Sequence, residues 1–359
     1  MVINVVGTRP NFMKMMPVIS GLNKLNIPNM LIHTGQHYDE NMSKVFFRDL
    51  RIPDPDIFLG VGSGSHAEIT AKIMIEFEKV CLKNNPRLVI VAGDVNSTLA
   101  CALAAKKLNI PIAHVESGLR SYDEEMPEEI NRILTDRMSD LLFVTEKSGI
   151  EHSLNEGIAR EKIHFVGNCM IDSVKKFLPA ALEQKPWDEY ALDEYDYTLI
   201  TLHRPSNVDS AKNINKVVRM LNEMSKSSKL VFPVHPRTKS KLAQSSHKLD
   251  GNILMLEPLP YLEFLGLMAK ARLVITDSGG IQEETTYLGV QCITFRKNTE
   301  RPVTVDLGTN QLVGTDPREL LKTFNKIING EIKKGSIPPK WDGNAGTRIV
   351  KIINEYLAK

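Results

Sequence analysis

Short apolar runs alternate with longer amphipathic runs along almost the whole chain, and no other feature limits the possible folds as strongly. An apolar run that is bounded by turn residues and followed by a helical pattern is typical of a βαβ unit in a parallel sheet. The expected strands are Val2–Val6, Met30–His33, Leu88–Ala92, Ile112–Val115, Leu141–Val144 and His164–Val166, then Thr198–Leu202, Leu230–Val234, Ile253–Leu256, Leu273–Thr276 and Cys292–Phe295. The predicted fold class is therefore α/β, with two doubly wound, Rossmann-like parallel sheets.

The length of the chain also indicates two domains, because 359 residues exceed what one hydrophobic core usually supports. We expect an N-terminal α/β domain over residues 1–170 and a C-terminal α/β domain over residues 171–343. A final helix over residues 344–359 is expected to pack back on the first domain, and the polar segment Gln184–Glu189 is the expected linker. Helical patterns in the first half lie near residues 11–25, 39–49, 65–84, 96–108, 128–138 and 146–156.

The composition is that of an ordinary globular enzyme, with 42% hydrophobic and 25% charged residues. A net charge of +2 gives no reason to expect nucleic acid or an anionic membrane as a partner. The four scattered cysteines fit reduced, buried thiols better than disulfides or a zinc site. No stretch approaches the roughly 20 apolar residues of a membrane span, and no signal-peptide pattern is present. We therefore expect a cytoplasmic protein.

Polar and charged residues gather where the predicted strands end. These segments are Gly7–Pro10, Gly93-Asp94, Glu116–Gly118, His203-Arg204, His235–Arg237 and Asp277–Gly280. Ligands of open α/β sheets bind beyond the carboxyl ends of the strands. Because both halves of the chain contribute, we expect the two domains to face a central cleft that holds the site.

The segment Ser278-Gly279-Gly280 is the strongest candidate for an anion site. It follows a predicted buried strand and opens a helical pattern, so free backbone N–H groups would stand at the positive end of a helix. The glycines let the backbone approach a phosphate, and Ser278 can either cap the helix or donate to a phosphate oxygen. Glu284 lies further along the same helix, where a carboxylate can hold ribose hydroxyls. The alternative is an ordinary strand-to-helix turn.

Several cations stand at the predicted strand ends beside these glycines. Arg9 would lie at the mouth of a helix begun by Pro10, where a bidentate phosphate contact is natural, and Lys14 follows it. His203 can act as an acid, a base or a phosphate donor because histidine titrates near neutral pH. Arg301 adds a further cation. The alternatives are a surface cation for Arg9 and a structural role for His203.

Three acids could carry proton transfer. Asp94 and Glu116 each end an apolar strand, and burial there raises the pKa of a carboxyl group toward the range of a general acid or base. Glu128 stands at the start of another helix. The alternatives are a helix cap for Asp94 and a simple first-turn acid for Glu128.

One glycine cluster has a different explanation. Gly60–Ser65 resembles part of a dinucleotide fingerprint, but it lacks the third glycine and follows no convincing buried strand. The sequence also has no P-loop and no metal-ligand spacing. We expect no cofactor and no metal.

Taken together, these motifs resemble those of the non-hydrolysing UDP-N-acetylglucosamine 2-epimerases, in order and over essentially the whole chain. The segments that carry the resemblance are Gly7–Pro10 with Lys14, Gly35–His37, Gly93-Asp94, His114–Arg120, Pro127–Arg132, His203-Arg204, Pro233–Pro236, Asp277–Glu284 and Glu300–Pro302. The resemblance implies the two-domain glycosyltransferase-B fold, a homodimer, and no metal or redox cofactor. It also implies reversible conversion of UDP-N-acetylglucosamine (UDP-GlcNAc) to UDP-N-acetylmannosamine (UDP-ManNAc), a nucleotide-sugar precursor of polysaccharides.

The same resemblance implies a mechanism and a set of site residues. A base removes the C2 proton while UDP leaves C1, and UDP then returns to the bound 2-acetamidoglucal as C2 is protonated from the opposite face. Asp94, Glu116 and Glu128 match the catalytic carboxylates, and His203 matches the histidine beside the diphosphate. The expected substrate contacts are Arg9, Lys14, His235, Phe264, Ser278, Gly279, Gly280, Glu284 and Arg301. Among them, Ser278 and Gly279 match the β-phosphate site, Glu284 the ribose site and Phe264 the uracil site.

Two departures from the family pattern bear on this chemistry. Ser206 stands where many relatives carry an acid three residues after the catalytic histidine, and Asp209 is the candidate to replace that acid. Bacterial members are activated by a second UDP-GlcNAc, and the residues that match this regulatory site are Gln36, His37 and Lys72. Tyr38 and Lys72 replace arginines there, and lysine cannot make the bidentate contact of an arginine.

Three other functions share parts of this pattern. A hydrolysing epimerase would release free ManNAc and UDP from the same fold. A glycosyltransferase of the same architecture would pass the sugar to an acceptor and would not need carboxylates for C2. A UDP-sugar sensor would bind the ligand without needing the acids.

Overall fold

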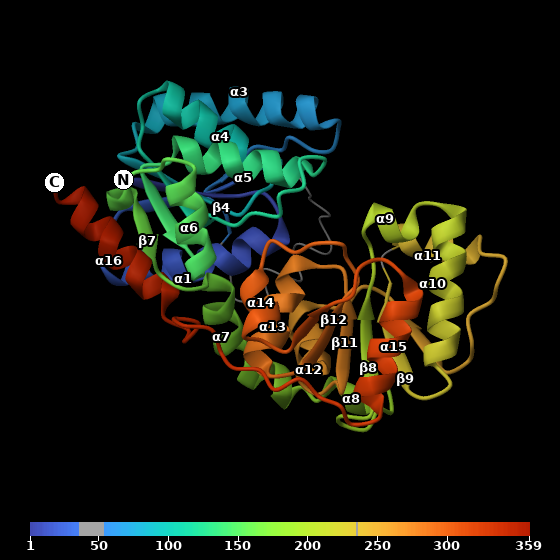
Figure 1. Ribbon diagram of the computed structural model, residues 1–359. Helices are drawn as coiled ribbons and strands as arrows, with labels where there is room; N and C mark the ends of the chain where they lie inside the picture. The colour runs from blue at the N-terminus through green and yellow to red at the C-terminus, as the bar shows by residue number, and fades with distance from the viewer. Residues whose placement is uncertain (36–53, 235) are drawn as a thin grey trace. The chain divides into compact units, whose positions relative to one another are not determined.

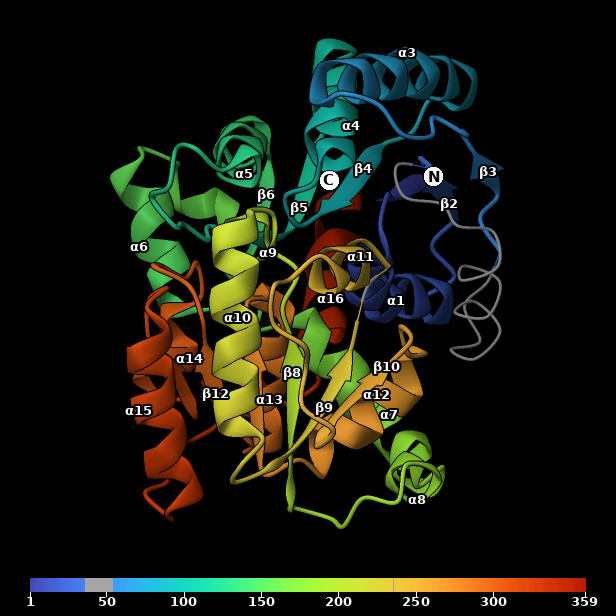
Figure 2. The ribbon, with the colours of Figure 1, turned by 90° about the vertical axis from the view of Figure 1, so that its right-hand side faces the viewer.

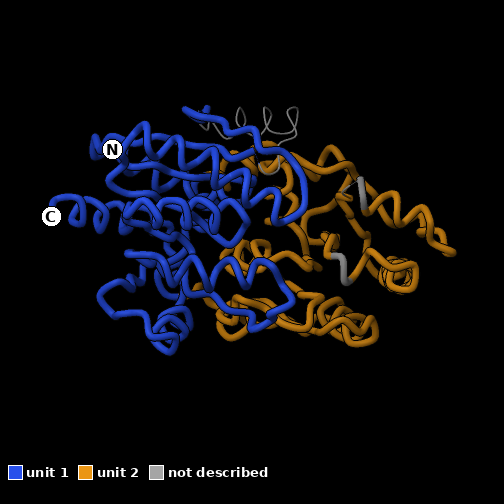
Figure 3. Tube along the Cα trace, turned by 90° about the horizontal axis from the view of Figure 1, so that it is seen from above, with its two compact units in different colours: residues 1–176, 339–359 blue, residues 177–338 orange. Residues whose placement is uncertain are grey.

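The computed structural model of the chain describes residues 1–35, 54–234 and 236–359 (Figure 1). It contains two compact units, which are residues 1–176 with 339–359 and residues 177–338 (Figure 3). The first boundary lies inside helix α7 (Cys169–Glu183), which the sequence patterns did not predict. The helical pattern near 39–49 falls outside the described residues. None of the described helices combines the length and the apolar character that a membrane span needs.

The first unit is an α/β unit with one parallel sheet. Its described elements are β1 Val2–Val6, α1 Arg9–Lys24, β2 Asn29–His33, β3 Ile57–Phe58, α3 His66–Asn84, β4 Leu88–Ala92, α4 Asn96–Lys107, β5 Ile112–Ser117, α5 Pro127–Met138, β6 Leu141–Val144, α6 Lys147–Asn155, the 3-10 helix η1 Arg160–Lys162, β7 Ile163–Phe165 and α16 Ala345–Leu357. The described part of this sheet has seven strands in the order β3-β2-β1-β4-β5-β6-β7. The order reverses between β1 and β4, which makes this pair the switch point where ligands of such sheets bind.

The apolar strands are buried in the core of this unit because helices cover the sheet. Strands β1 and β4 are buried along their whole length. Helices α3 and α4 share one hydrophobic core with them, and α3 packs across α4 (Figure 1). Helix α16 packs on α1 (Figure 2). The carboxylate of Asp172 accepts the first N–H groups of α16, from Ala345 at 3.0 Å and Gly346 at 2.7 Å, and so fixes the start of that helix.

The second unit repeats the architecture. Its elements are α8 Pro186–Glu189, β8 Tyr197–Thr201, α9 Pro205–Val208, α10 Ala211–Met224, β9 Lys229–Pro233, α11 Pro236–Ala243, β10 Ile253–Leu256, α12 Tyr261–Ala269, β11 Leu273–Thr276, α13 Gly279–Leu288, β12 Gln291–Thr294, α14 Pro302–Asp306, β13 Asn310–Leu312 and α15 Pro317–Ile328. The six strands described here pair in the parallel order β10-β9-β8-β11-β12-β13, with the switch point between β8 and β11. Helices α10 and α15 lie side by side and close one core (Figure 1).

The structure confirms the α/β class with two doubly wound parallel sheets. Every predicted strand is present, with ends that differ by at most a residue or two. Strands β3 and β13 were not predicted, because runs of two or three residues are too short to show a period. All four cysteines are free, buried thiols.

The predicted linker is wrong. Residues 184–189 belong to the second unit, where Pro186 and Trp187 are buried at the start of α8. Helix α12 comes so close that a Cβ on Gly266 would lie 2.8 Å from the Pro186 ring. The polar composition of the segment predicted a linker, whereas its buried tryptophan anchors it in the second unit.

Candidate active site

The carboxylates of the first unit stand at the ends of two paired strands. Ala92 of β4 pairs with Val115 of β5, so Asp94 and Glu116 leave the sheet at the same edge. Glu116 has φ of +68°, a left-handed conformation that is rare for a residue with a side chain. Backbone of this kind is held in place by its surroundings and is concentrated at functional sites. The structure thus brings the two expected acids to one edge.

Lys14 reaches Glu116 from helix α1. Its Nζ lies 2.8 Å from each carboxylate oxygen of Glu116, and both side chains are buried. The same Nζ would lie 3.1 Å from a Cβ on Gly93, the residue before Asp94. The described structure makes Lys14 the counter-ion of Glu116, and its expected contact with substrate stays a prediction. The buried carboxylate of Glu116 therefore has a cation beside it in the described structure.

Arg132 of α5 connects the other acids. It forms ion pairs with Asp94 and with Glu129. Glu129 is buried and accepts the backbone N–H groups of Ser121 and Tyr122, so it holds the loop before α5. Glu128 is only half-buried in the first turn of α5. The two neighbours therefore differ, because Glu129 supports the loop while Glu128 remains the acid that can meet a ligand.

A network of buried charged side chains holds the strand ends that carry Asp94 and Glu116. The His114 ring lies 2.6 Å from Asp136 Oδ1 and 2.7 Å from the Gly93 carbonyl oxygen, one contact through each ring nitrogen. Asp136 also accepts the N–H of Gly118 and a guanidinium N–H of Arg120. Burial by itself would raise the pKa of Asp136, but His114 and Arg120 hold it below its usual value. The network ties the turns around Asp94 and Glu116 to α5.

The start of α1 is organised by Asn11. Its Oδ1 accepts the N–H groups of Gly7 at 3.2 Å and Thr8 at 3.1 Å, and its Nδ2 donates to the Ala92 carbonyl oxygen. A Cβ on Gly7 would lie 2.2 Å from Ser97 Oγ, so this turn requires glycine. Arg9 begins the helix, and burial lowers its pKa. The predicted strand-end turn is therefore tied to β4.

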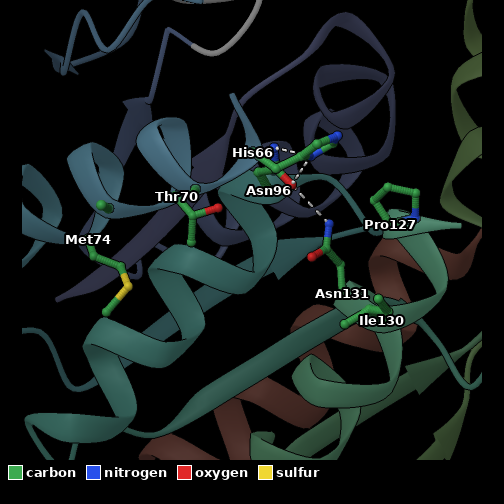
Figure 4. Close-up of a pocket in the computed structure, with 9 residues that line it drawn as sticks. His66, Thr70, Met74, Asn96, Pro127, Ile130 and Asn131 are labelled. Atoms are coloured by element: carbon green, nitrogen blue, oxygen red, sulfur yellow. Dashed lines mark hydrogen bonds between the residues drawn. The ribbon is translucent and has the colours of Figure 1, made fainter. Parts of the chain in front are cut away.

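A pocket of about 390 Å³ lies beside this edge (Figure 4). It is lined by His66, Ala67, Thr70, Ala71, Met74, Asn96, Pro127, Ile130 and Asn131. Asn96 hydrogen-bonds the His66 ring, and Asn131 donates to the Asp94 carbonyl oxygen at 2.8 Å. The lining contains no carboxylate, so the expected proton-transfer groups lie outside the pocket.

In the second unit, helix α13 begins at the predicted glycines. Ser278 is the N-cap residue, but its side chain makes no capping hydrogen bond in the described structure. A Cβ on Gly279 would lie 2.5 Å from Arg301 Nη1 and 2.6 Å from Glu300 Oε1. Gly280 follows in the first turn. The start of α13 thus lies where the sequence predicted it, and an anion site at its first-turn N–H groups and the Ser278 hydroxyl stays a prediction.

Arg301 lies beside these glycines but is already paired with acids. Its Nε lies 2.8 Å from Glu283, its Nη1 contacts Glu300, and Arg296 lies 2.8 Å from Glu300. All four side chains are buried. These acids hold Arg301 beside the start of α13, and its expected contact with phosphate stays a prediction.

His203 and Asp277 follow β8 and β11, the two strands at the switch point. His203 Nδ1 lies 3.0 Å from Asp277 Oδ1, and the His203 side chain is 55% exposed while Asp277 is fully buried. In the described structure, His203 thus contacts the carboxylate of Asp277.

Glu284 lies in α13 and accepts the Tyr261 hydroxyl at 3.0 Å. Burial raises the pKa of Glu284 to about 8, and Tyr261 opposes this shift while the charge of Glu283 adds to it. Phe264, half-buried, stands one turn after Tyr261 on α12 and so shares its side of that helix. Helix α13 thus carries a carboxyl group that hydrogen-bonds a hydroxyl, and helix α12 carries the aromatic ring of Phe264.

Three of the expected residues, Gln36, His37 and His235, lie outside the described residues. Lys72 is described, and its side chain is exposed on α3. Other residues were given no role from the sequence, namely Asp277, Arg132, Asn11 and Tyr261. An acid after a buried strand was a usable signal for Asp277, as it was for Asp94. Nothing in the sequence pointed to Tyr261.

Known proteins resemble this chain over its length. A family model described as UDP-N-acetylglucosamine 2-epimerase matches residues 22–354. The chain is 45% identical to the UDP-N-acetylglucosamine 2-epimerase of Methanococcus maripaludis, over 97% of each chain. It is 39% identical to the UDP-2,3-diacetamido-2,3-dideoxy-D-glucuronate 2-epimerase of Pseudomonas aeruginosa, over 100% of this chain and 99% of that one. A crystal structure of the Methanocaldococcus jannaschii UDP-GlcNAc 2-epimerase in complex with UDP-GlcNAc and UDP matches 99% of both chains, with 43% identity and a TM-score of 0.91.

Proposed function

Because the chain belongs to the UDP-N-acetylglucosamine 2-epimerase family, we propose that it interconverts UDP-GlcNAc and UDP-ManNAc without net hydrolysis. The observation that carries the proposal is the match, at a TM-score of 0.91, to a 2-epimerase crystallised with UDP-GlcNAc and UDP. The strand-end acids and the α13 start supply groups suited to this chemistry.

The second unit would hold the nucleotide. The first turn of α13 and Ser278 would bind the β-phosphate, because helix N-termini favour anions. Glu284 would accept or donate hydrogen bonds at the ribose, and Phe264 would stack on the uracil. These positions leave the hexose to the acids of the first unit.

The reaction would proceed by elimination and readdition. A carboxylate takes the C2 proton, the C2–H electrons form a C1=C2 double bond, and the C1–O electrons leave with UDP. The reverse step adds UDP to C1 of the 2-acetamidoglucal and a proton to the other face of C2. Two faces require two proton-transfer groups, and Asp94, Glu116 and Glu128 are the candidates. Lys14, which pairs with Glu116, would hold that carboxylate in place.

One similarity favours a second substrate. The Pseudomonas aeruginosa relative is named for a UDP-2,3-diacetamido-2,3-dideoxy-D-glucuronate, which is epimerised at the same carbon. Both sugars carry a 2-acetamido group and a UDP leaving group, so the same acids would serve either. The substituents at C3 and C6 separate them.

We also propose a homodimer that forms through helices α3 and α5. Large apolar side chains stand exposed there, with Ile75 and Leu82 on α3 and Ile130, Ile133 and Leu134 on α5. Both helices pack on α4 and line one pocket, so they share one face of the unit. A contiguous apolar face of this kind is typical of a protein interface.

Incubation with each UDP-sugar in D₂O, followed by proton NMR, tests the function. We expect UDP-ManNAc to appear from UDP-GlcNAc, with deuterium at C2 of both UDP-sugars and no free sugar. Free ManNAc would indicate a hydrolysing enzyme, and no exchange without an acceptor would indicate a transferase or a sensor. Faster turnover of the diacetamido-glucuronate would reassign the substrate.

Two matched variants assign the acids within that experiment. Asp94→Asn and Glu116→Gln should bind UDP yet lose C2 exchange by about 100-fold or more, which is the usual worth of a general acid or base. Glu319→Gln changes an exposed glutamate of α15 and serves as the control. Normal exchange in both active-site variants would remove these acids from the mechanism.

A further inference from the structure

Two neighbouring strand ends join His203 to Asp277. Strands β8 and β11 pair in register through Thr201 and Thr276, and the Asp277 N–H donates to the Thr201 carbonyl oxygen. His203 therefore follows β8 at the level where Asp277 follows β11. Their side chains meet with 3.0 Å between Nδ1 and Oδ1.

The Asp277 carboxylate is surrounded by donors. It accepts the backbone N–H groups of His203 at 3.0 Å and Arg204 at 2.9 Å, and the Asn207 side-chain amide at 2.9 Å. Burial by itself would raise the pKa of Asp277, but the hydrogen bonds and charge of His203, with Asn207 and Arg204, hold it below its usual value. An ionised carboxylate has no proton to give, so the proton in the contact belongs to Nδ1 of His203.

This contact determines which nitrogen of His203 can meet a ligand. With Nδ1 committed to Asp277, Nε2 is the nitrogen left for chemistry, on a side chain that is more than half exposed. Asp277 also immediately precedes Ser278, and its carbonyl oxygen accepts Arg204 Nε at 2.8 Å. One buried acid thus fixes the histidine loop and the expected phosphate loop together.

We propose that Asp277 is a positioning residue that holds His203 with Nδ1 protonated, so that Nε2 exchanges a proton with the departing phosphate of the nucleotide. The inference rests on the proposed function and deepens it. When the C1–O bond breaks, its electron pair stays on the β-phosphate oxygen, and the Nε2 proton of the imidazolium passes to that oxygen. On readdition the oxygen bonds C1 and the proton returns to Nε2.

Histidine NMR tests the positioning directly. Two-bond ¹H–¹⁵N spectra of the full chain, with His203 assigned by comparison with His203→Gln, report which ring nitrogen carries the proton. At a pH where the His203 ring carries a single proton, we expect that proton on Nδ1 in the wild type and a mixture of both forms in Asp277→Asn. We also expect kcat for epimerisation to fall by about 10–100-fold, as for other residues that orient a functional group, while Kd for UDP changes by less than about 3-fold.

Asp172→Asn is the matched control. Asp172 is another largely buried carboxylate that accepts two backbone N–H groups, but it belongs to the first unit and contacts no histidine in the described structure. It should lower the thermal midpoint without changing the His203 tautomer or kcat. An Nε2–H form in the wild type, or an unchanged tautomer and kcat in Asp277→Asn, would overturn the proposal.

If Asp277→Asn does not fold, the wild-type spectrum by itself still tests the proposal. That spectrum also does not depend on turnover. A wild-type protein with no C2 exchange would contradict the proposed epimerase, whereas the Nδ1 reading would still support or overturn the Asp277 contact.

Discussion

Glu284 shows how burial sets the charge of a single residue. Its folded-state pKa of about 8 lies well above the ordinary value near 4.5, so the folded protein favours the protonated form. The stability linked to Glu284 is therefore fully present below about pH 4.5 and is lost as the pH rises through 8. Glu284→Gln cannot ionise, and it should gain thermal stability relative to wild type as the pH rises, by roughly 5 °C between pH 5.5 and 8.5.

Calorimetry of both proteins across this range is the measurement. Glu319→Gln, on the exposed side of α15, controls for the loss of one surface charge. A constant difference between wild type and Glu284→Gln from pH 5.5 to 8.5 would show that Glu284 is already ionised in the folded protein.

At the scale of elements, the start of α13 depends on a glycine that leaves room for a buried ion pair. Gly279→Ala would place a methyl group 2.5 Å from Arg301 and 2.6 Å from Glu300. Overpacking of this kind costs about 1–3 kcal/mol, and relief requires either the buried ion pair or the first turn to shift. We expect UDP affinity to fall about 10-fold or more, measured by titration calorimetry.

Gly251→Ala provides the comparison, because a Cβ there meets no atom within 4 Å. It should bind UDP as the wild type does. Wild-type UDP affinity in Gly279→Ala would place the phosphate away from α13.

Elements were predicted well where the physics is local. Buried parallel strands such as Leu88–Ala92 are apolar on both faces, so they appear as uninterrupted apolar runs. Helix α7 was missed although Ile171, Val174 and Phe177 are buried along it, and Pro179 in its interior weakens the helical pattern. The sequence also could not show which acid pairs with which cation, since Arg132 meets Asp94 across 38 positions. The end of a strand can be predicted from neighbouring residues, whereas the two partners of an ion pair can lie far apart in the sequence.

At the scale of the whole molecule, the exposed apolar faces of α3 and α5 predict a dimer in solution. Light scattering should give twice the chain mass of 40.3 kDa for the wild type. Leu82→Glu combined with Ile130→Glu should shift the protein to the monomer, because burying two unpaired carboxylates costs several kcal/mol.

Met255→Glu introduces the same charge at an exposed apolar position of β10 and should leave the mass unchanged. A wild-type monomer at micromolar concentration would rule out the proposed dimer. A dimer that survives both α3 and α5 substitutions would place the interface elsewhere.

The return of the chain to the first unit has a consequence for biosynthesis. Residues 177–338 form an insertion within the first unit, and α16 leaves the ribosome only after the whole insertion has been made. Until then α1 lacks the helix that packs against it, where Val350 lies against Gly21 and Gly346 against Pro17. The insertion can complete its own core during translation, whereas the unit that surrounds it must wait for its last helix. A nascent chain stalled before residue 345 should therefore hold a folded second unit and an unfinished first unit.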